Sequence, residues 1–132
     1  MPATITYPAR SSGDQTVNYL RAPITFLIGT AGIVKVGTLP AGCVVSRCYV
    51  ALSVVFNFGT NNLIKVGTAA ADTTYSGATL SVAALGVTAG VPLASAAMLP
   101  AVDTPVICTS LCTGTAGTTG TGFVVVEYLP VA

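Results

Sequence analysis

Apolar and polar side chains alternate along much of this chain, and this period-two pattern constrains its fold more than any other feature. From Val17 onward, Tyr19, Arg21 and Thr25 fall on one face of an extended segment, opposite an apolar row. A period of two is typical of β-strands that bury one face. The pattern therefore predicts an antiparallel sheet with one face in water. The apolar row of this first strand is Leu20, Ala22, Ile24, Phe26 and Ile28.

Further segments have the residue content of strands and are separated by turn-forming residues. Residues 29–32 and 59–62 are predicted to be turns of hairpins that join consecutive strands. Because no helices intervene, parallel βαβ units are excluded. About seven short strands with turns at this spacing predict an all-β antiparallel β-sandwich. The further strands are expected at 33–36, 43–58, 63–66, 106–111 and 123–129, and the apolar face of the longest is Val44, Cys48, Val50, Leu52, Val54 and Phe56.

Three segments are less regular. Residues 80–85 are rich in Ala and Leu, which favours one or two helical turns, and residues 91–99 suit a short strand or a turn. The Gly/Thr tract at 112–122 lacks the following helix or lysine of a phosphate-binding loop, so a flexible hairpin tip is expected. Residues 1–16 show no sustained period and are interpreted as an extended N-terminal arm or a disordered tail. Residues 17–132 would then form a single β-sandwich domain.

Charged residues are scarce. Asp, Glu, Lys and Arg make up 7% of the 132 residues, and histidine is absent, whereas an ordinary soluble domain has about a quarter charged residues. Without histidine, no Ser/His/Asp or Cys/His catalytic system can form. The carboxylates Asp14, Asp72, Asp103 and Glu127 are far apart in the sequence, so no glycosidase pair is evident. We therefore expect no enzymatic activity and no cofactor.

The few charges also bear on partners. The basic residues are scattered, which argues against nucleic-acid binding. Residues 73–102 carry no charge, but Gly and Pro interrupt them, so they cannot form a membrane-spanning helix. No signal peptide is expected either. A net charge of +1 gives copies of the chain little electrostatic repulsion in solution. We therefore expect the chain to be covered by copies of itself or by a partner, and the charge-free segment 73–102 is the predicted covered surface. The basic residues are Arg10, Arg21, Lys35, Arg47 and Lys65, and the last four fall on faces opposite the apolar rows.

The cysteines occur as two pairs, Cys43 with Cys48 and Cys108 with Cys112. These spacings match neither a zinc ribbon nor a redox C-x-x-C pair, so no metal site is expected. Reduced and partly buried thiols are predicted. A bridge between the two pairs is left open for the case that their strands are neighbours.

Two further patterns concern individual strands. The sequence Val34–Thr38 recurs in similar form at Ile64–Thr68 and is interpreted as two hairpins of similar construction. The segment Phe123–Leu129 is strongly β-prone and would aggregate at an exposed sheet edge. It should therefore be central in a sheet or paired across an interface.

Three segments together resemble small head proteins of tailed bacteriophages. They are Gly42–Thr68, which contains F-N-F-G-T-N, then Ala69–Asp72, and the final Val124–Pro130, which contains V-V-V-E-Y. The resemblance implies a jelly-roll-like β-sandwich and a role as a capsid decoration (cement) protein on the outer surface of the virion, made in the host cytoplasm. It also implies dimers or trimers that bind the major capsid protein. From the charge pattern above, we expect neither nucleic acid nor a membrane as a partner.

Two other hypotheses remain beside this one. A head- or tail-fibre module could bind a host-surface glycan through tyrosines, and a small hydrolase would depend on Asp72 or Asp103. At Asp72 an Asx-turn and an interface salt bridge are both open. The tyrosines are Tyr7, Tyr19, Tyr49, Tyr75 and Tyr128, and the candidate partner contacts are Arg10, Asp14, Tyr19, Asp72, Tyr75 and Leu99.

Overall fold

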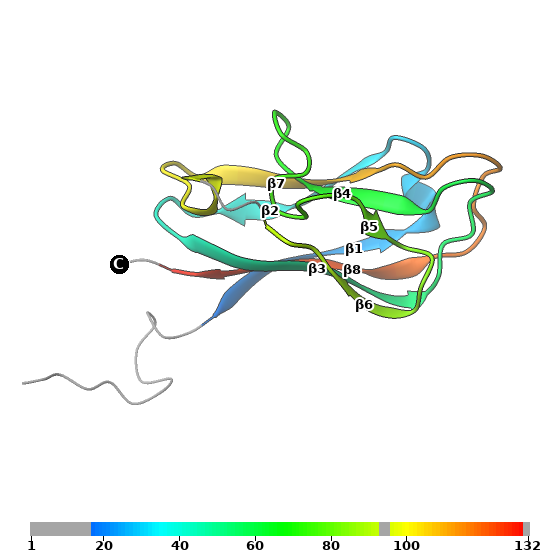
Figure 1. Ribbon diagram of the computed structural model, residues 1–132, viewed down its shortest axis with the longest axis horizontal. Coiled ribbons are helices and arrows are strands. Elements are labelled where there is room, and N and C mark those ends of the chain that lie inside the picture. The colour runs from blue at the N-terminus through cyan, green and yellow to red at the C-terminus, as the bar shows by residue number, and fades with distance from the viewer. Residues whose placement is uncertain (1–16, 93–95, 131–132) are drawn as a thin grey trace, which may run out of the picture.

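Two antiparallel four-stranded sheets pack face to face as a sandwich (Figure 1). The computed structural model describes residues 17–92 and 96–130. Sheet A has the order β1 (Asn18–Thr25), β8 (Thr121–Leu129), β3 (Val44–Val54) and β6 (Gly86–Ala89). Sheet B has the order β2 (Ile33–Leu39), β7 (Thr104–Ser110), β4 (Leu63–Gly67) and β5 (Leu80–Ser81). This is the strand order of a jelly roll, so the predicted all-β, jelly-roll-like sandwich is confirmed.

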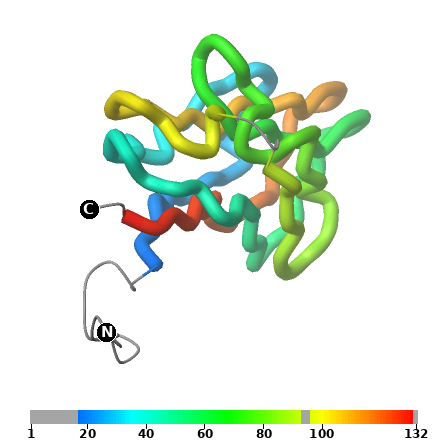
Figure 2. The backbone as a smooth tube through the Cα atoms, turned by 60° about the vertical axis from the view of Figure 1, so that its left-hand side comes forward, coloured from blue at the N-terminus to red at the C-terminus, as the bar shows by residue number. Residues whose placement is uncertain are grey.

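Most consecutive strands belong to opposite sheets, and Figure 2 traces the chain through these crossings. The hairpins predicted across residues 29–32 and 59–62 are therefore wrong, because β1 does not pair with β2, nor β3 with β4. Turn-forming residues end a strand equally well when the chain folds back beside it and when it crosses to the facing sheet. Between β1 and β2 the crossing includes a short 3-10 helix, η2 (Phe26–Ile28).

The repeated sequence marks two strands that flank the same neighbour. β2 and β4 both pair with β7, and Val34 and Val66 both lie opposite Cys108. The interpretation as two similar hairpins is wrong. The two copies are aligned differently against β7, because Val34 is the first residue of its copy and Val66 is the third residue of the other.

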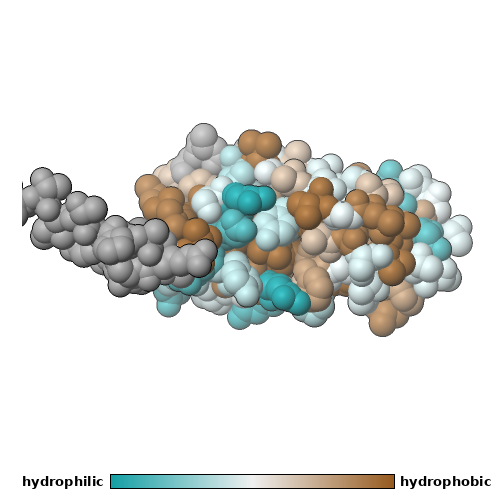
Figure 3. Space-filling view, turned by 90° about the horizontal axis from the view of Figure 1, so that it is seen from below, coloured by the Kyte–Doolittle hydropathy of each residue, from teal (hydrophilic) through white to brown (hydrophobic). Residues whose placement is uncertain are grey.

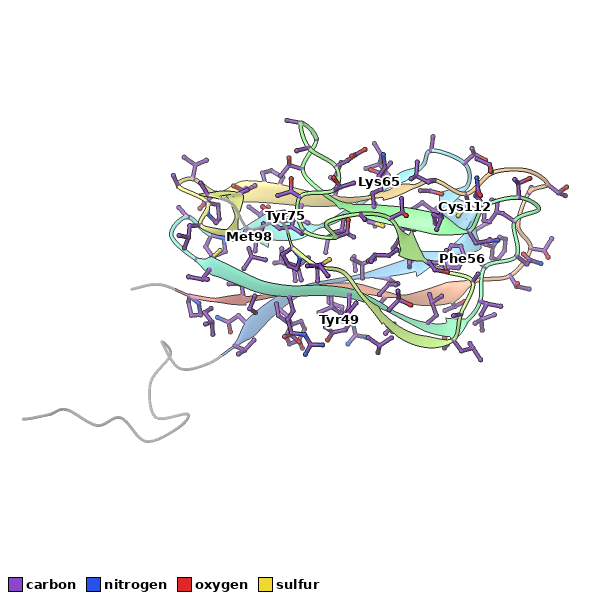
Figure 4. The ribbon with its side chains drawn as sticks, in the orientation of Figure 1. Tyr49, Phe56, Lys65, Tyr75, Met98 and Cys112 are labelled. Carbon is purple, nitrogen blue, oxygen red and sulfur yellow. The ribbon has the colours of Figure 1, made fainter. Side chains whose placement is uncertain are left out.

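The core lies between the sheets, where Phe56 and Tyr75 are also buried (Figure 4). The first predicted apolar row is confirmed within β1, where Ala22 and Ile24 are buried and Leu20 packs against the core. Phe26 and Ile28 also pack against the core, but from η2, so the prediction that the strand continues through them is wrong. In β3 the predicted row holds only in part, because Val54 is 43% exposed and Val45 is buried. Two β-bulges, at 45–47 and 52–54, explain the difference, since each inserted residue shifts which side chains face inward. As a result, Val45 points into the core in place of Val44, which is only partly buried.

The segment 80–85 is not helical. Leu80 and Ser81 form β5, which pairs with Ile64 and Leu63 of β4. Leu80 and the following Val82 are buried, so strand pairing and burial outweigh the helix propensity of Ala and Leu. Farther along, residues 96–98 form a short 3-10 helix, η3 (Ala96–Met98). Residues 93–95, within the segment expected to be a strand or turn, lie outside the described residues.

The Gly/Thr tract at 112–122 crosses between the sheets, so it is not a hairpin tip. Asn57 holds it in place, because its Oδ1 accepts hydrogen bonds from the amides of Thr118 and Thr119 at 2.8 and 2.9 Å. Gly120 lies against the Phe56 ring, where a Cβ would come within 2.6 Å of a ring carbon. The tract is thus tied to the loop that follows β3.

Two expectations about single elements are confirmed. β8, which contains the β-prone segment, lies between β1 and β3 in the middle of sheet A. All four cysteines are buried, and their thiols are free.

Within the described ranges, neither 3-10 helix is long and apolar enough to cross a membrane. The expected arm at residues 1–16 lies outside the described residues, and the domain boundary after it stays a prediction.

Candidate interaction face on sheet A

The outer face of sheet A carries an ordered array of apolar and aromatic side chains. The inward positions of β1, β3 and β8 hold core residues, so the alternate residues of these strands point outward. Figure 3 views the molecule from this side and shows brown apolar side chains with few teal ones between them. The strand register arranges the outward residues in three rows. These are Arg21–Val125–Tyr49–Ala89, Pro23–Phe123–Ala51–Val87 and Tyr19–Glu127–Arg47.

A shallow groove of about 260 Å³ lies in the middle of this face. We call it the aromatic groove. Two of its aromatic rings are accessible, with Tyr19 61% and Phe123 37% exposed. The groove is lined by Tyr19, Arg21, Tyr49, Ala51, Phe123 and Val125. It therefore combines a mostly apolar floor with one cationic side chain.

Arg21 lies over an aromatic ring of the neighbouring strand. Its guanidinium carbon is 3.8 Å from the centroid of the Phe123 ring, a distance at which a cation is attracted to the ring face. Among the described residues no carboxylate forms an ion pair with Arg21. The positive charge of the groove is therefore not neutralised within the described fold.

A second basic residue on this face is already paired. Arg47 Nη1 lies 3.9 Å from Glu127 Oε2. The guanidinium carbon of Arg47 lies 5.1 Å from the centroid of the Tyr49 ring. The Tyr49 hydroxyl donates a hydrogen bond of 3.3 Å to Glu127 Oε1, and Figure 4 shows Tyr49 on the outer side of β3. Burial, and then the negative charge of Glu127, raise the pKa of Tyr49. The raised pKa favours the protonated phenol, which is the form that donates to Glu127 at the rim of the groove.

The six predicted partner contacts do not come together. Tyr19 lines the aromatic groove, whereas Leu99 is 57% exposed at a different site, beside η3. Tyr75 is 1% exposed and belongs to the core, so its side chain is not on the surface of this fold. Arg10 and Asp14 lie outside the described residues. That these residues contact a partner stays a prediction.

The sixth, Asp72, lies on the opposite side of the molecule. Its carboxylate forms an ion pair with Lys65 of β4, and Lys65 points away from the core on the outer side of sheet B (Figure 4). The pair secures the loop after β4, in which the Thr68 amide also donates to the Ala71 carbonyl at 3.0 Å. Asp72 thus has a partner within its own chain.

The residues invoked by the other hypotheses are dispersed as well. Tyr128 is only partly exposed and packs against the core, and Tyr7 lies outside the described residues. Asp103 accepts a hydrogen bond of 2.9 Å from the backbone amide of Ala41. In the described ranges, no cluster of three or more His, Cys, Asp or Glu residues could hold a metal ion.

Part of the charge-free segment 73–102 is interior rather than surface. Its first residues, 74–76, are buried, as are Leu80 and Val82. Several other members expose apolar side chains, and Val87 borders the face of sheet A described above. These exposed members are Leu85, Val87, Val91, Leu99 and Val102. The hypothesis that a partner covers this segment stays untested.

Sequence reasoning did not find the pairing of Arg21 with Phe123. Arg21 lies at an outward position of a period-two pattern that is visible in the sequence, whereas Phe123 begins a continuously apolar run that does not show which way its side chain points. Their contact depends on the register of β1 against β8, where Pro23 lies opposite Phe123 and Arg21 opposite Val125. No local signal specifies a register between segments so far apart in the chain.

The fold matches solved structures of two phage capsids. No protein-family model and no curated protein matches the sequence. A chain of the acidic stable capsid structure of Helicobacter pylori bacteriophage KHP30 has a TM-score of 0.63 and 16% identity, over 88% of this chain and 89% of that one. A chain of the cyanophage Pam1 capsid asymmetric unit has a TM-score of 0.61 and 21% identity, over 97% and 94%. The likeness is one of fold.

Proposed function

We propose that this chain is a capsid decoration, or cement, protein that binds the outside of a phage capsid and bridges neighbouring major capsid subunits. The observation that carries the proposal is the likeness in fold to chains of two phage capsids, over 88% and 97% of this chain. In each comparison the two covered shares are nearly equal. The capsid chains are therefore about as long as this one, and the likeness involves nearly the whole of each.

The surface of sheet A supports an interaction role. Interface cores are depleted in charge and enriched in Tyr, Phe and Arg. Tyrosine and arginine in particular often contribute most of the binding energy. The aromatic groove has this composition, with two tyrosines, one phenylalanine and one arginine. The role is structural rather than enzymatic, since Asp72 and Asp103 are occupied by contacts that stabilise loops. For copies of the chain, closed dimers or trimers are the expected arrangement.

The test is reconstitution on capsids. Particles lacking the chain are prepared, purified chain is added, and binding is measured by co-sedimentation. Electron microscopy then locates the added density, and the temperature of genome release measures particle stability. We expect density on the outer surface, in contact with more than one capsid subunit, and release at a higher temperature. Absence of binding, or binding without any gain in stability, would contradict the proposal.

A second candidate function is glycan binding by a fibre-type module. The observation that favours it is the accessible ring of Tyr19, 61% exposed, in the same groove as Arg21, because sugars stack on aromatic faces. A glycan array with the purified chain tests this function. Binding that is lost on Tyr19→Ala, in a chain that does not bind capsids, would replace the first proposal with this one.

A further inference from the structure

We propose that the aromatic groove receives a protein segment of the capsid that places a carboxylate beside an apolar side chain, with Arg21 as the residue that pairs with the carboxylate. The inference rests on the proposed function and specifies the chemistry of its partner. It concerns the six residues that line the groove, and four observations support it.

The first observation is the state of charge. Arg21 has no carboxylate partner among the described residues, whereas Arg47 is paired with Glu127. A partner that covered the groove with apolar surface alone would remove Arg21 from water without replacing its hydrogen bonds. Such burial of an unpaired charge is strongly unfavourable. A partner that covers this groove must therefore supply an anion.

The second observation is the position of the guanidinium and the state of its donors. Its carbon lies over the Phe123 ring, 3.8 Å from the centroid. No described residue accepts a hydrogen bond from its N–H groups, which are therefore free to bind a partner. A carboxylate accepts two such donors side by side, which makes it the natural anion for an arginine held in this way.

The third observation is the floor of the groove. Beside Arg21 it is formed by Ala51, Phe123 and Val125, and Val125 is only 7% exposed. These residues offer carbon surface and few hydrogen-bonding atoms. An apolar side chain next to the carboxylate would bury its surface here without leaving a polar group unsatisfied.

The fourth observation favours a protein segment over a sugar as the occupant of the groove. A sugar displays hydroxyl groups around its ring, and each one that is buried needs a partner. In the groove, the Tyr49 hydroxyl already donates its proton to Glu127, which leaves the hydroxyl of Tyr19 and the N–H groups of Arg21 as the free side-chain donors. This arrangement suits one carboxylate and one apolar group better than a polyhydroxylated ring.

The first experiment measures affinity for capsids that lack the chain. Arg21→Gln removes the charge, and Phe123→Leu removes the ring but keeps an apolar side chain. Lys35→Gln is the matched control, since Lys35 is an exposed basic residue on β2 of sheet B.

We expect Arg21→Gln to weaken binding about tenfold and to lose the salt dependence seen with the unmodified chain. Phe123→Leu should weaken binding less, and Lys35→Gln should bind as the unmodified chain does. Thermal unfolding of each variant verifies that the fold is intact.

The second experiment identifies the partner carboxylate. Arg21→Lys places a primary amine in the groove, and a carbodiimide then joins that amine to a carboxylate in contact with it. An amide bond forms, and the oxygen lost from the carboxyl group leaves with the carbodiimide as a urea. The native Lys65–Asp72 pair provides an internal positive control for this coupling. Mass spectrometry should find Lys at position 21 joined to an Asp, Glu or C-terminal carboxylate of a capsid protein, next to an apolar residue.

The outcomes separate the inference from the proposed function. If the unmodified chain binds capsids and Arg21→Gln binds equally well, the inference fails and the decoration role stands. If the unmodified chain does not bind capsids at all, both fail. If the chain binds a glycan and loses it on Arg21→Gln, the groove is a sugar site and the inference is overturned.

Discussion

Cys48 of β3 and Cys108 of β7 approach each other from opposite sheets, near enough that negative charge on Cys108 would raise the pKa of Cys48. Burial is the larger effect at both residues. It raises the pKa of each thiol from 9.0 to about 12. The interior of the sandwich thus holds both thiols in the neutral form, and this has consequences for stability and for reactivity.

The first consequence is a loss of stability at alkaline pH. Well below pH 9.0 both thiols are protonated whether the chain is folded or unfolded. Between pH 9.0 and about 12 the unfolded chain ionises its cysteines, while the folded chain keeps Cys48 and Cys108 neutral. The unfolded state then binds fewer protons, so the free energy of unfolding falls as pH rises, by up to about 1.4 kcal/mol per pH unit for each group.

Urea unfolding at a series of pH values on both sides of 9.0 measures this loss. The double variant Cys48→Ala/Cys108→Ala should be less stable at neutral pH, but its stability should fall less steeply. Some dependence will remain, because burial also raises the pKa of Cys43 and Tyr75. Parallel curves for the two proteins would contradict the assignment.

The second consequence is resistance to alkylation. The thiolate is the reactive form of cysteine, and Cys48 and Cys108 are buried with a pKa of about 12. Iodoacetamide at neutral pH should leave these two residues unmodified in the folded protein and modify all four cysteines in denaturant. Peptide mass spectrometry identifies the sites. Rapid modification of Cys48 or Cys108 without denaturant would show that the sandwich opens readily.

Gly122 of β8 has no room for a side chain. A Cβ at this position would lie 2.3 Å from the carbonyl oxygen of Ala51 and 2.5 Å from Leu52 Cδ2. The oxygen belongs to the backbone of β3, which cannot move without disturbing sheet A. We expect Gly122→Ala to lower the free energy of unfolding by about 3 kcal/mol.

The matched control is Gly42→Ala. Gly42 has a φ of +81°, but nothing lies within 4 Å of a Cβ placed there. Its replacement should therefore cost only the strain of a left-handed backbone, about 1 kcal/mol. Denaturant unfolding of both variants makes the comparison, and equal losses would refute the steric explanation for Gly122.

The Lys65–Asp72 ion pair should contribute little to stability. The side chains are 19% and 42% exposed, and exposed pairs of this kind are worth at most about 1 kcal/mol. Asp72→Asn should therefore shift the unfolding midpoint only slightly. It should also leave capsid binding unchanged, because the pair lies on the side of the molecule opposite the aromatic groove. A strong loss of binding would instead place Asp72 in an interface, as one sequence-based interpretation suggested.

The sequence is informative about strands and weak about their partners. Alternation located the buried row of β1 and the outward positions of Arg21 and Arg47, because side-chain direction is a local property of a strand. The pairing of β2 with β7 was not predictable, since a turn at residues 29–32 looks the same for a hairpin and for a crossing. The two bulges in β3 were equally hidden, because they depend on the fit to β8.

The residues of the candidate site were also only partly predictable from the sequence, because their contacts depend on strand pairing. Tyr19 was identified as a contact from its type and position, and it does line the groove. Tyr75 was selected on similar grounds, but it is buried next to β4, where the Tyr75 amide donates to the Val66 carbonyl at 3.1 Å. The contact of Arg21 with Phe123 required the alignment of the first and last strands, which only the folded chain provides.

The place of β8 between β1 and β3 has a consequence for the timing of synthesis. β8 leaves the ribosome after the other seven described strands, and until it emerges β1 lacks the strand that it pairs with in sheet A. Phe123, whose ring contacts the Arg21 guanidinium, belongs to β8 and is therefore also translated late. The nascent chain therefore cannot display the groove early, and a capsid encounters this surface only after translation of the sandwich is complete.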